Sequence, residues 1–310
     1  MAVASTPRFL MCPPRHFAVT YSINPWMNPT EWRRRPEALA QTAEIEWRSL
    51  KGLIEQAGAA IDLMMPAAGV PDLVFTANAA VVLDGKALLA NFRHPERRLE
   101  EPHFAAAFDN LIERNIVNCR VSLPPDLVLE GAGDCIWDAK RQLFWVGFGP
   151  RSSERAAMVV EETFGFPAIG IELVDPRFYH LDTAFSVLAD GELMYLKEAL
   201  SSNSLRLLRD RASSYDRIEV GEEDACGMCL NGIAIGRMLI LSNCSSELRR
   251  RLADRGYAVS LTSLSSFQLS GGSAYCLTLR TDLASESPVF ASEIAHALHR
   301  HGAPDVQGVT

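Results

Sequence analysis

The chain has 310 residues, of which 48% are hydrophobic and 22% are charged, and its formal net charge is −8. This composition is typical of a folded globular protein and excludes a disordered or fibrous one. The acidic balance argues against general nucleic-acid binding, no apolar run is long enough to span a membrane, and the N-terminus has no recognisable secretory signal. Seven cysteines without a paired framework indicate a reducing, cytoplasmic environment.

A short pattern recurs four times along the chain and a fifth time in part. A polar residue precedes an apolar run, a tight turn follows, and a second apolar run completes a predicted hairpin. The four complete copies cover residues 78–90, 134–147, 182–196 and 231–241, and the fifth opens at Cys276. The openings are 45 to 56 residues apart, a period typical of radial or solenoid repetition.

Helical patterns separate these predicted hairpins. The spacing of apolar residues predicts helices over residues 36–58, 151–165, 246–256 and 290–302, and Ser246 and Gly256 fit the start and stop of the third. Each unit is therefore expected to be a strand hairpin with a covering helix. We expect the five polar openings to meet at one place in a single domain over residues 1–310, with a short strand around residues 8–12 closing a ring.

Cys276 lies in a glycine-rich turn, Gly271-Gly-Ser-Ala-Tyr-Cys276, that leads into an apolar Leu-Thr-Leu run. Glycine lets the backbone turn sharply close to a ligand, and the following run would fix the position of the sulfur. This placement favours an attacking thiolate. The ordinary alternative is a buried cysteine that behaves as a small hydrophobic side chain.

Four motifs carry a resemblance to the guanidine-modifying (pentein) superfamily of arginine deiminases, dimethylargininases and amidinotransferases. They are Phe75-Thr-Ala-Asn78, Leu129-Glu-Gly-Ala-Gly-Asp134, Tyr179-His-Leu-Asp182 and the turn that ends at Cys276. The resemblance implies an α/β fold, a five-bladed αβ propeller with pseudo-fivefold repeats, over nearly the whole chain.

Three further features are similar to the arginine dihydrolase branch, which converts arginine to ornithine, ammonia and carbon dioxide. They are Met11-Cys-Pro-Pro14, Ile23-Asn-Pro-Trp-Met27 and the asparagine at position 78, where deiminases and dimethylargininases carry an aspartate. The last difference argues against simple deiminase or dimethylargininase activity.

The resemblance implies a nucleophile, a proton carrier and its support. Cys276 would form a covalent thiouronium adduct with the guanidino carbon, and a cationic substrate beside it would favour the thiolate. His180 would protonate the leaving amine and deprotonate the incoming water, with Glu130 supporting it. A core histidine and an acidic turn residue are the ordinary alternatives.

The remaining predicted site residues would bind the substrate. The resemblance implies that Asp182 holds the guanidinium group, and Asp134 is expected to contribute to the same acidic pocket. Asp182 shares one face of an expected extended segment with His180. By resemblance, Arg97 and Arg151 would fix the α-carboxylate; a solvated surface position is the alternative for Arg97. Arg151 at the start of a predicted helix is unfavourable for the helix dipole, which favours a role in binding.

Asn24 and Asn78 are predicted to separate a double hydrolysis from a single one. The first hydrolysis leaves a neutral ureido group, and an amide can both donate to it and accept from it. A turn residue before Pro25 is the alternative for Asn24.

No metal or organic cofactor is expected, because Cys226 and Cys229 have metal-like spacing but no second pair or nearby histidine completes a set. The expected partner is a small molecule, either arginine or an N-methylated arginine. Binding to nucleic acid or to a membrane is not expected. The oligomeric state stays open, with a homo-oligomer as one option. Alternative functions are a dimethylargininase or arginine deiminase that yields citrulline, an amidinotransferase, and a binding protein similar to ribosome anti-association factors.

Overall fold

The computed structural model describes residues 6–286 and has an α/β fold. Within this part of the chain, fifteen strands form five three-stranded sheets with the same internal order. The repetition read from the sequence is therefore present as a repetition of sheets.

The four complete predicted hairpins are confirmed, and each supplies two antiparallel strands to one sheet. Positive φ angles of 72° at Gly85, 81° at Gly191 and 55° at Gly236 allow three of the tight turns. The paired strands are β3 (Ala80–Leu83) with β4 (Lys86–Leu89), β6 (Cys135–Asp138) with β7 (Leu143–Phe148), β9 (Phe185–Val187) with β10 (Leu193–Tyr195), and β12 (Ile233–Ile235) with β13 (Met238–Leu241).

Each of these sheets has a third strand that the sequence pattern did not reveal. It pairs in parallel with the second strand of the hairpin, and a helix makes the crossover that parallel pairing requires. The third strands are β5 (Cys119–Ser122), β8 (Ala168–Glu172), β11 (Arg217–Glu219) and β14 (Ala258–Leu261), and the crossover helices are α4 (Glu101–Glu113), α5 (Ala156–Phe164), α7 (Ser202–Arg211) and α9 (Ser246–Ala253).

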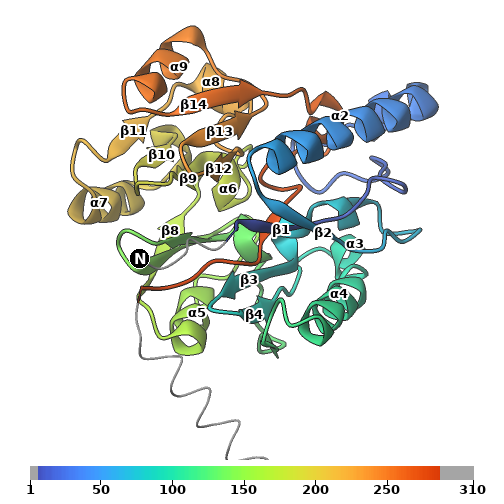
Figure 1. The fold of residues 1–310 in the computed structure, drawn as a ribbon, viewed down its shortest axis with the longest axis horizontal. Helices are drawn as coiled ribbons and strands as arrows, with labels where there is room; N and C mark the ends of the chain where they lie inside the picture. Colours follow the sequence, from blue (N-terminus) through green and yellow to red (C-terminus); the bar gives the residue numbers. More distant parts are fainter. Residues whose placement is uncertain (1–5, 287–310) are drawn as a thin grey trace, which may run out of the picture.

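The fifth sheet joins the two ends of the described chain. Strand β1 (Arg8–Met11) lies between β15 (Leu279–Arg280), to which it is antiparallel, and β2 (Ala60–Leu63), to which it is parallel. Helix α2 (Pro36–Gln56) makes the crossover and lies above β1 and β2 in Figure 1. The expected short strand near residues 8–12 is confirmed.

The predicted helix boundaries agree in part with the structure. Helix α2 begins at Pro36 as expected, but α5 begins at Ala156 and not at residue 151. The cap of α9 is Ser245, whose hydroxyl accepts from the Leu248 N–H, and not Ser246. The helix expected over residues 290–302 lies outside the described residues. The remaining helical segments are α1 (Pro29–Arg34), α3 (Pro95–Arg98), α6 (Leu181–Ala184), α8 (Glu222–Cys226), α10 (Ser265–Gln268), η1 (Pro71–Val74), η2 (Thr76–Ala79), η3 (Gly131–Gly133) and η4 (Lys197–Ala199).

The first hairpin strands and β15 line one cavity of about 120 Å³. All five strands β3, β6, β9, β12 and β15 contribute side chains, and Asp182 lies in the same wall. The segments that immediately precede these strands are therefore brought together, which is what creates the candidate site. Across residues 6–286, none of the helices combines the length and apolarity needed to traverse a bilayer.

Candidate active site

The five residues that open the repeated units are all buried in short turns just before the first strands. Asn78 lies in η2, Asp134 follows η3, and Asp182 lies in α6. Asn231 and Cys276 precede β12 and β15. Each of the five is at most 2% exposed to solvent. At Asn78, Asp134 and Asp182 the expected strand starts are thus single helical turns.

Direct contacts join three of the openings around the thiol. The Sγ atom of Cys276 donates to Oδ2 of Asp182 at 3.2 Å and accepts from Nδ2 of Asn231 at 3.1 Å. The Cys276 carbonyl accepts from the Ala77 N–H at 3.1 Å, which brings the Asn78 turn alongside. Asn231 was counted as an opening in the sequence but was given no role there.

Burial disfavours ionisation of both the thiol and its acidic neighbour. Burial raises the pKa of Cys276 well above its usual range, and the Asp182 carboxylate raises it further. Burial also raises the pKa of Asp182 to about 7, against the opposing hydrogen bonds from Cys276 and Asn231. A cation bound beside both groups would lower both pKa values, because an adjacent positive charge favours an anion.

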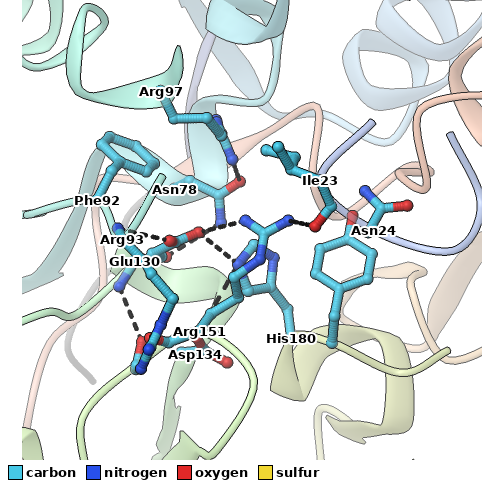
Figure 2. A network of polar contacts seen from close by, with 12 residues as sticks. Ile23, Asn24, Asn78, Phe92, Arg93, Arg97, Glu130, Asp134, Arg151 and His180 are labelled. Atoms are coloured by element: carbon cyan, nitrogen blue, oxygen red, sulfur yellow. Dashed lines mark hydrogen bonds and ion pairs between the residues drawn. The ribbon is translucent and has the colours of Figure 1, made fainter. Parts of the chain in front are cut away.

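The imidazole of His180 is held by a buried carboxylate. Its Nε2 lies 2.7 Å from Oε2 of Glu130, and Nη1 of Arg151 donates to the same oxygen at 2.9 Å (Figure 2). Burial would raise the pKa of Glu130, but Arg151 and His180 together hold it well below its usual range. Glu130 is therefore an ionised support for the ring.

Asp134 is fixed by hydrogen bonds beside this pair. Its Oδ2 accepts from the Ser152 hydroxyl at 2.6 Å and lies 4.0 Å from Nε2 of His180, and its Oδ1 accepts from the Leu181 N–H at 2.9 Å. The Ser152 oxygen also accepts from the Glu130 N–H at 3.0 Å. Burial raises the pKa of Asp134 to about 6. Sequence reasoning missed Ser152, because nothing in its spacing indicates that it bridges two acidic residues.

Arg97 is 3% exposed, so the solvated-surface alternative is excluded. Its Nε and Nη2 donate to both carboxylate oxygens of Glu100 at 2.9 and 2.7 Å, and its Nη1 donates to Oδ1 of Asn78 at 2.8 Å. Nδ2 of Asn78 donates to the Glu130 carbonyl at 3.0 Å. These bonds fix the orientation of the Asn78 amide. Sequence reasoning missed Glu100, although its spacing of three from Arg97 was a readable signal.

Two local expectations about the backbone were wrong. Arg151 is not at a helix start, because α5 begins at Ala156, so the dipole argument does not apply to it. Its Nη2 instead donates to the Ile23 carbonyl at 3.1 Å.

His180 and Asp182 do not share an extended segment: His180 is the extended residue before α6, and Asp182 lies within that turn. The change of backbone direction lets one side chain contact Glu130 and the other Cys276.

Asn24 makes turn contacts and also joins two segments. Its Oδ1 accepts from the Trp26 and Met27 N–H groups at 2.9 and 3.2 Å, which is the local role anticipated as its alternative. Its Nδ2 donates to the Ser270 carbonyl at 3.0 Å, next to the turn that carries Cys276. A Cβ at Gly271, where φ is +87°, would lie 2.9 Å from Oδ1 of Asn24, so this approach requires glycine.

Two of the buried polar atoms that lack a hydrogen-bond partner belong to predicted site residues. Within residues 6–286, Nδ1 of His180 and Oδ1 of Asp182 have no hydrogen-bond partner, and both side chains are 1% exposed. Buried polar atoms are rarely left unpaired. They indicate that the site receives a ligand that can hydrogen-bond to an imidazole and a carboxylate.

Within residues 6–286, no three His, Cys, Asp or Glu side chains are arranged to hold a metal ion. Cys226 ends helix α8 and lies 3.9 Å from Nη1 of Arg177, while Cys229 is buried in the hydrophobic core.

The chain is similar to proteins that act on arginine and its methylated forms. The sequence model of the family "N,N dimethylarginine dimethylhydrolase, eukaryotic" matches residues 13–282. The bifunctional arginine dihydrolase/ornithine cyclodeaminase ArgZ of Synechocystis sp. is 38% identical over 88% of this chain, which spans 37% of the length of that protein. The N(G),N(G)-dimethylarginine dimethylaminohydrolase of Mycobacterium tuberculosis is 35% identical over 88% of this chain and 85% of its own length.

A solved structure agrees with these sequence matches. The N-terminal domain of ArgZ, an arginine dihydrolase from the ornithine-ammonia cycle in cyanobacteria, was solved as a cysteine-to-serine mutant bound to substrate. It superposes with a TM-score of 0.82 and 36% identity over 90% of this chain and 99% of that chain. The chain therefore belongs to the N,N-dimethylarginine dimethylhydrolase family, a member of the guanidine-modifying superfamily that its four motifs resemble.

Proposed function

We propose that this protein hydrolyses the guanidino group of arginine to give ornithine, ammonia and carbon dioxide. The observation that carries the proposal is the pairing of two buried dyads. The Cys276 thiol faces the Asp182 carboxylate at 3.2 Å, and the His180 imidazole faces Glu130 at 2.7 Å. The similarity to ArgZ, whose N-terminal domain has been solved bound to substrate, supports the same activity.

The first half of the reaction uses the thiol. A guanidinium bound against Asp182 lowers the thiol pKa, so the sulfur can attack the guanidino carbon. His180, oriented through Nε2 by Glu130, protonates the departing ammonia. It then deprotonates the water that attacks the covalent adduct.

The second hydrolysis requires that the neutral ureido product stays in place. Asn78 is a neutral amide held by Arg97 and by the Glu130 carbonyl, and Asn24 is fixed beside the cysteine turn. In our proposal these amides hold the ureido group for a second attack, because an amide can donate to its oxygen. By resemblance, Arg97 and Arg151 are proposed to fix the substrate carboxylate while paired with Glu100 and Glu130, and Asp134 to assist in binding the guanidinium.

Hydrolysis of methylated arginine to citrulline is the second candidate. It is favoured by the family match and by the 35% identity to the mycobacterial dimethylaminohydrolase. We rank this activity second because position 78 holds an asparagine, whereas hydrolysis of methylated arginine is expected to need an aspartate there. Two alternatives remain. An amidinotransferase would produce a new guanidino compound, whereas a binding protein similar to ribosome anti-association factors would release no product.

The finer architecture belongs to the same proposal. We infer that the five sheets are blades of a five-bladed αβ propeller, and that residues 1–310 form a single catalytic domain. The five first strands around one cavity support this arrangement. We also propose that the protein is cytoplasmic and that it binds a small-molecule substrate without a cofactor. It would act either as a monomer or as a homo-oligomer.

Product analysis with isotopically labelled arginine tests it. Purified protein should release one ornithine and two ammonia per arginine, detected by mass spectrometry, and the Cys276→Ser variant should release neither. Citrulline as the end product, or methylamine from methylated arginine at a higher kcat/KM, would place the second candidate first. No product from arginine or its methylated forms would contradict an enzymatic role.

A further inference from the structure

Asn231 is the one opening residue to which the proposed reaction gives no role. It lies between α8 and β12, and its side chain is fully buried. In the other four units the corresponding positions hold Asn78, Asp134, Asp182 and Cys276, all of which are predicted site residues. The position of Asn231 in the repeat therefore suggests a function in the same reaction.

The hydrogen bonds of Asn231 use the whole amide. Nδ2 donates to Sγ of Cys276 at 3.1 Å and to the Asp182 carbonyl at 3.3 Å. Oδ1 accepts from the backbone N–H groups of Ser273 and Cys276 at 2.9 and 3.2 Å. If Oδ1 and Nδ2 of Asn231 were exchanged, the NH₂ group would face the N–H donors of Ser273 and Cys276, which could not form hydrogen bonds with it. The amide is therefore oriented with a donor on the sulfur.

This contact favours the charged form of the sulfur. A hydrogen bond to an ionised acceptor is shorter and about twice as strong as one between neutral groups. Burial and Asp182 raise the pKa of Cys276, and the hydrogen bond from Asn231 opposes that rise. No other side chain within residues 6–286 donates a hydrogen bond to this sulfur.

We propose that Asn231 is a catalytic residue that stabilises the Cys276 thiolate when it attacks and when it leaves. The inference rests on the proposed function, since it takes Cys276 as the nucleophile. In the attack, the Sγ–H proton passes to Oδ2 of Asp182 and a sulfur lone pair forms the C–S bond. The electron pair of one C–N π bond moves to its nitrogen, which neutralises the guanidinium, and no proton passes through Asn231.

The Asn231→Asp variant separates this role from simple support of the turn. An ionised aspartate keeps acceptors for the Ser273 and Cys276 N–H groups but loses the donor to sulfur. We expect kcat to fall about 10- to 100-fold, with KM changed less than threefold. Alkylation of Cys276 by iodoacetamide, followed by peptide mass spectrometry, should be about tenfold slower at pH 8, since fewer thiolates form.

Two further variants complete the test. Asn243→Asp makes the same charge change at an exposed position of the same unit, and it should match the wild type in both measurements. Asn231→Ser is neutral and too short to reach the sulfur, so it should also slow alkylation. A wild-type alkylation profile in both Asn231 variants, or failure of both to fold, would assign Asn231 to the turn alone and overturn the proposal. Activity retained in Cys276→Ser would instead contradict the proposed function.

Discussion

Nε2 of His180 lies 2.7 Å from Oε2 of Glu130, and both side chains are at most 1% exposed. Arg151 binds the same carboxylate oxygen, so the negative charge of Glu130 is shared between a guanidinium and an imidazole. This relationship fixes the ring nitrogen that faces the carboxylate, and within residues 6–286 it leaves Nδ1 without a hydrogen-bond partner.

Glu130→Gln should therefore lower kcat by roughly 100-fold or more, since general acid–base catalysis typically contributes 10²–10⁴-fold. Glutamine keeps the shape but cannot hold a protonated imidazole or balance the charge of Arg151. Steady-state kinetics with arginine measure the effect. Glu172→Gln, the same change at an exposed position of β8, should retain wild-type rates. A Glu130→Gln enzyme with wild-type kcat would show that His180 does not depend on this carboxylate.

Asn78→Asp should convert the enzyme from two hydrolytic steps towards one. The aspartate would still accept from Arg97, but it loses the donor to the Glu130 carbonyl and to a ureido oxygen. Mass spectrometry should detect citrulline in at least a tenfold larger share of the products. Asn110→Asp on the exposed face of α4 is the matched control. An unchanged ratio of ornithine to citrulline would refute this account of the second step.

Gly131→Ala should destabilise the protein and disturb the Asn78 turn. At this residue φ is +62°, and a Cβ would lie 2.6 Å from the Ala77 carbonyl oxygen. Gly69 has φ +83° with nothing within 4 Å of a Cβ, so Gly69→Ala adds backbone strain alone. We expect about 1 kcal/mol for Gly69→Ala and about 3 kcal/mol or more for Gly131→Ala. Denaturant unfolding measures both, and equal costs would mean that the turn relaxes around the methyl group.

Asp182→Asn should make the protein more stable at neutral pH while it abolishes activity. The pKa of Asp182 is raised from 3.8 to about 7, so its folded form holds a proton more tightly than its unfolded form. This contribution to stability is fully present below about pH 4 and is lost as the pH rises towards 7. The asparagine variant has no such loss, so its advantage should grow over that window to the order of a few kcal/mol.

Thermal or denaturant unfolding at several pH values between 4 and 8 checks this prediction. Asp210→Asn, at an exposed position of α7, should show no such growth with pH. A stability difference for Asp182→Asn that stays constant across the window would mean that Asp182 remains ionised throughout.

Local patterns in the chain were sufficient to predict the four hairpins and the chemical residues at their openings. Alternating or continuous apolar runs around glycine turns are read over a few residues, so they need no knowledge of the rest of the fold. The thiol at position 276 was predicted from its glycine-rich turn, whereas the roles of His180, Glu130 and Asp182 were predicted from the resemblance of their motifs to a known superfamily. The third strands were not found, because a strand such as β5 is exposed along its length and carries no apolar pattern.

Only the tertiary structure decided which side chains meet. The pairing of β1 with β15 joins residues more than 260 positions apart, and the contact between Asn231 and Cys276 spans 45. Neither follows from local spacing, because both depend on how strands from all five sheets come to line one cavity. Tertiary packing also buries the Arg97–Glu100 pair, and the helical turn α6 ends the extended segment at His180. The sequence therefore determined the chemical groups of this protein, and the packing of its repeats determined their partners and their charge states.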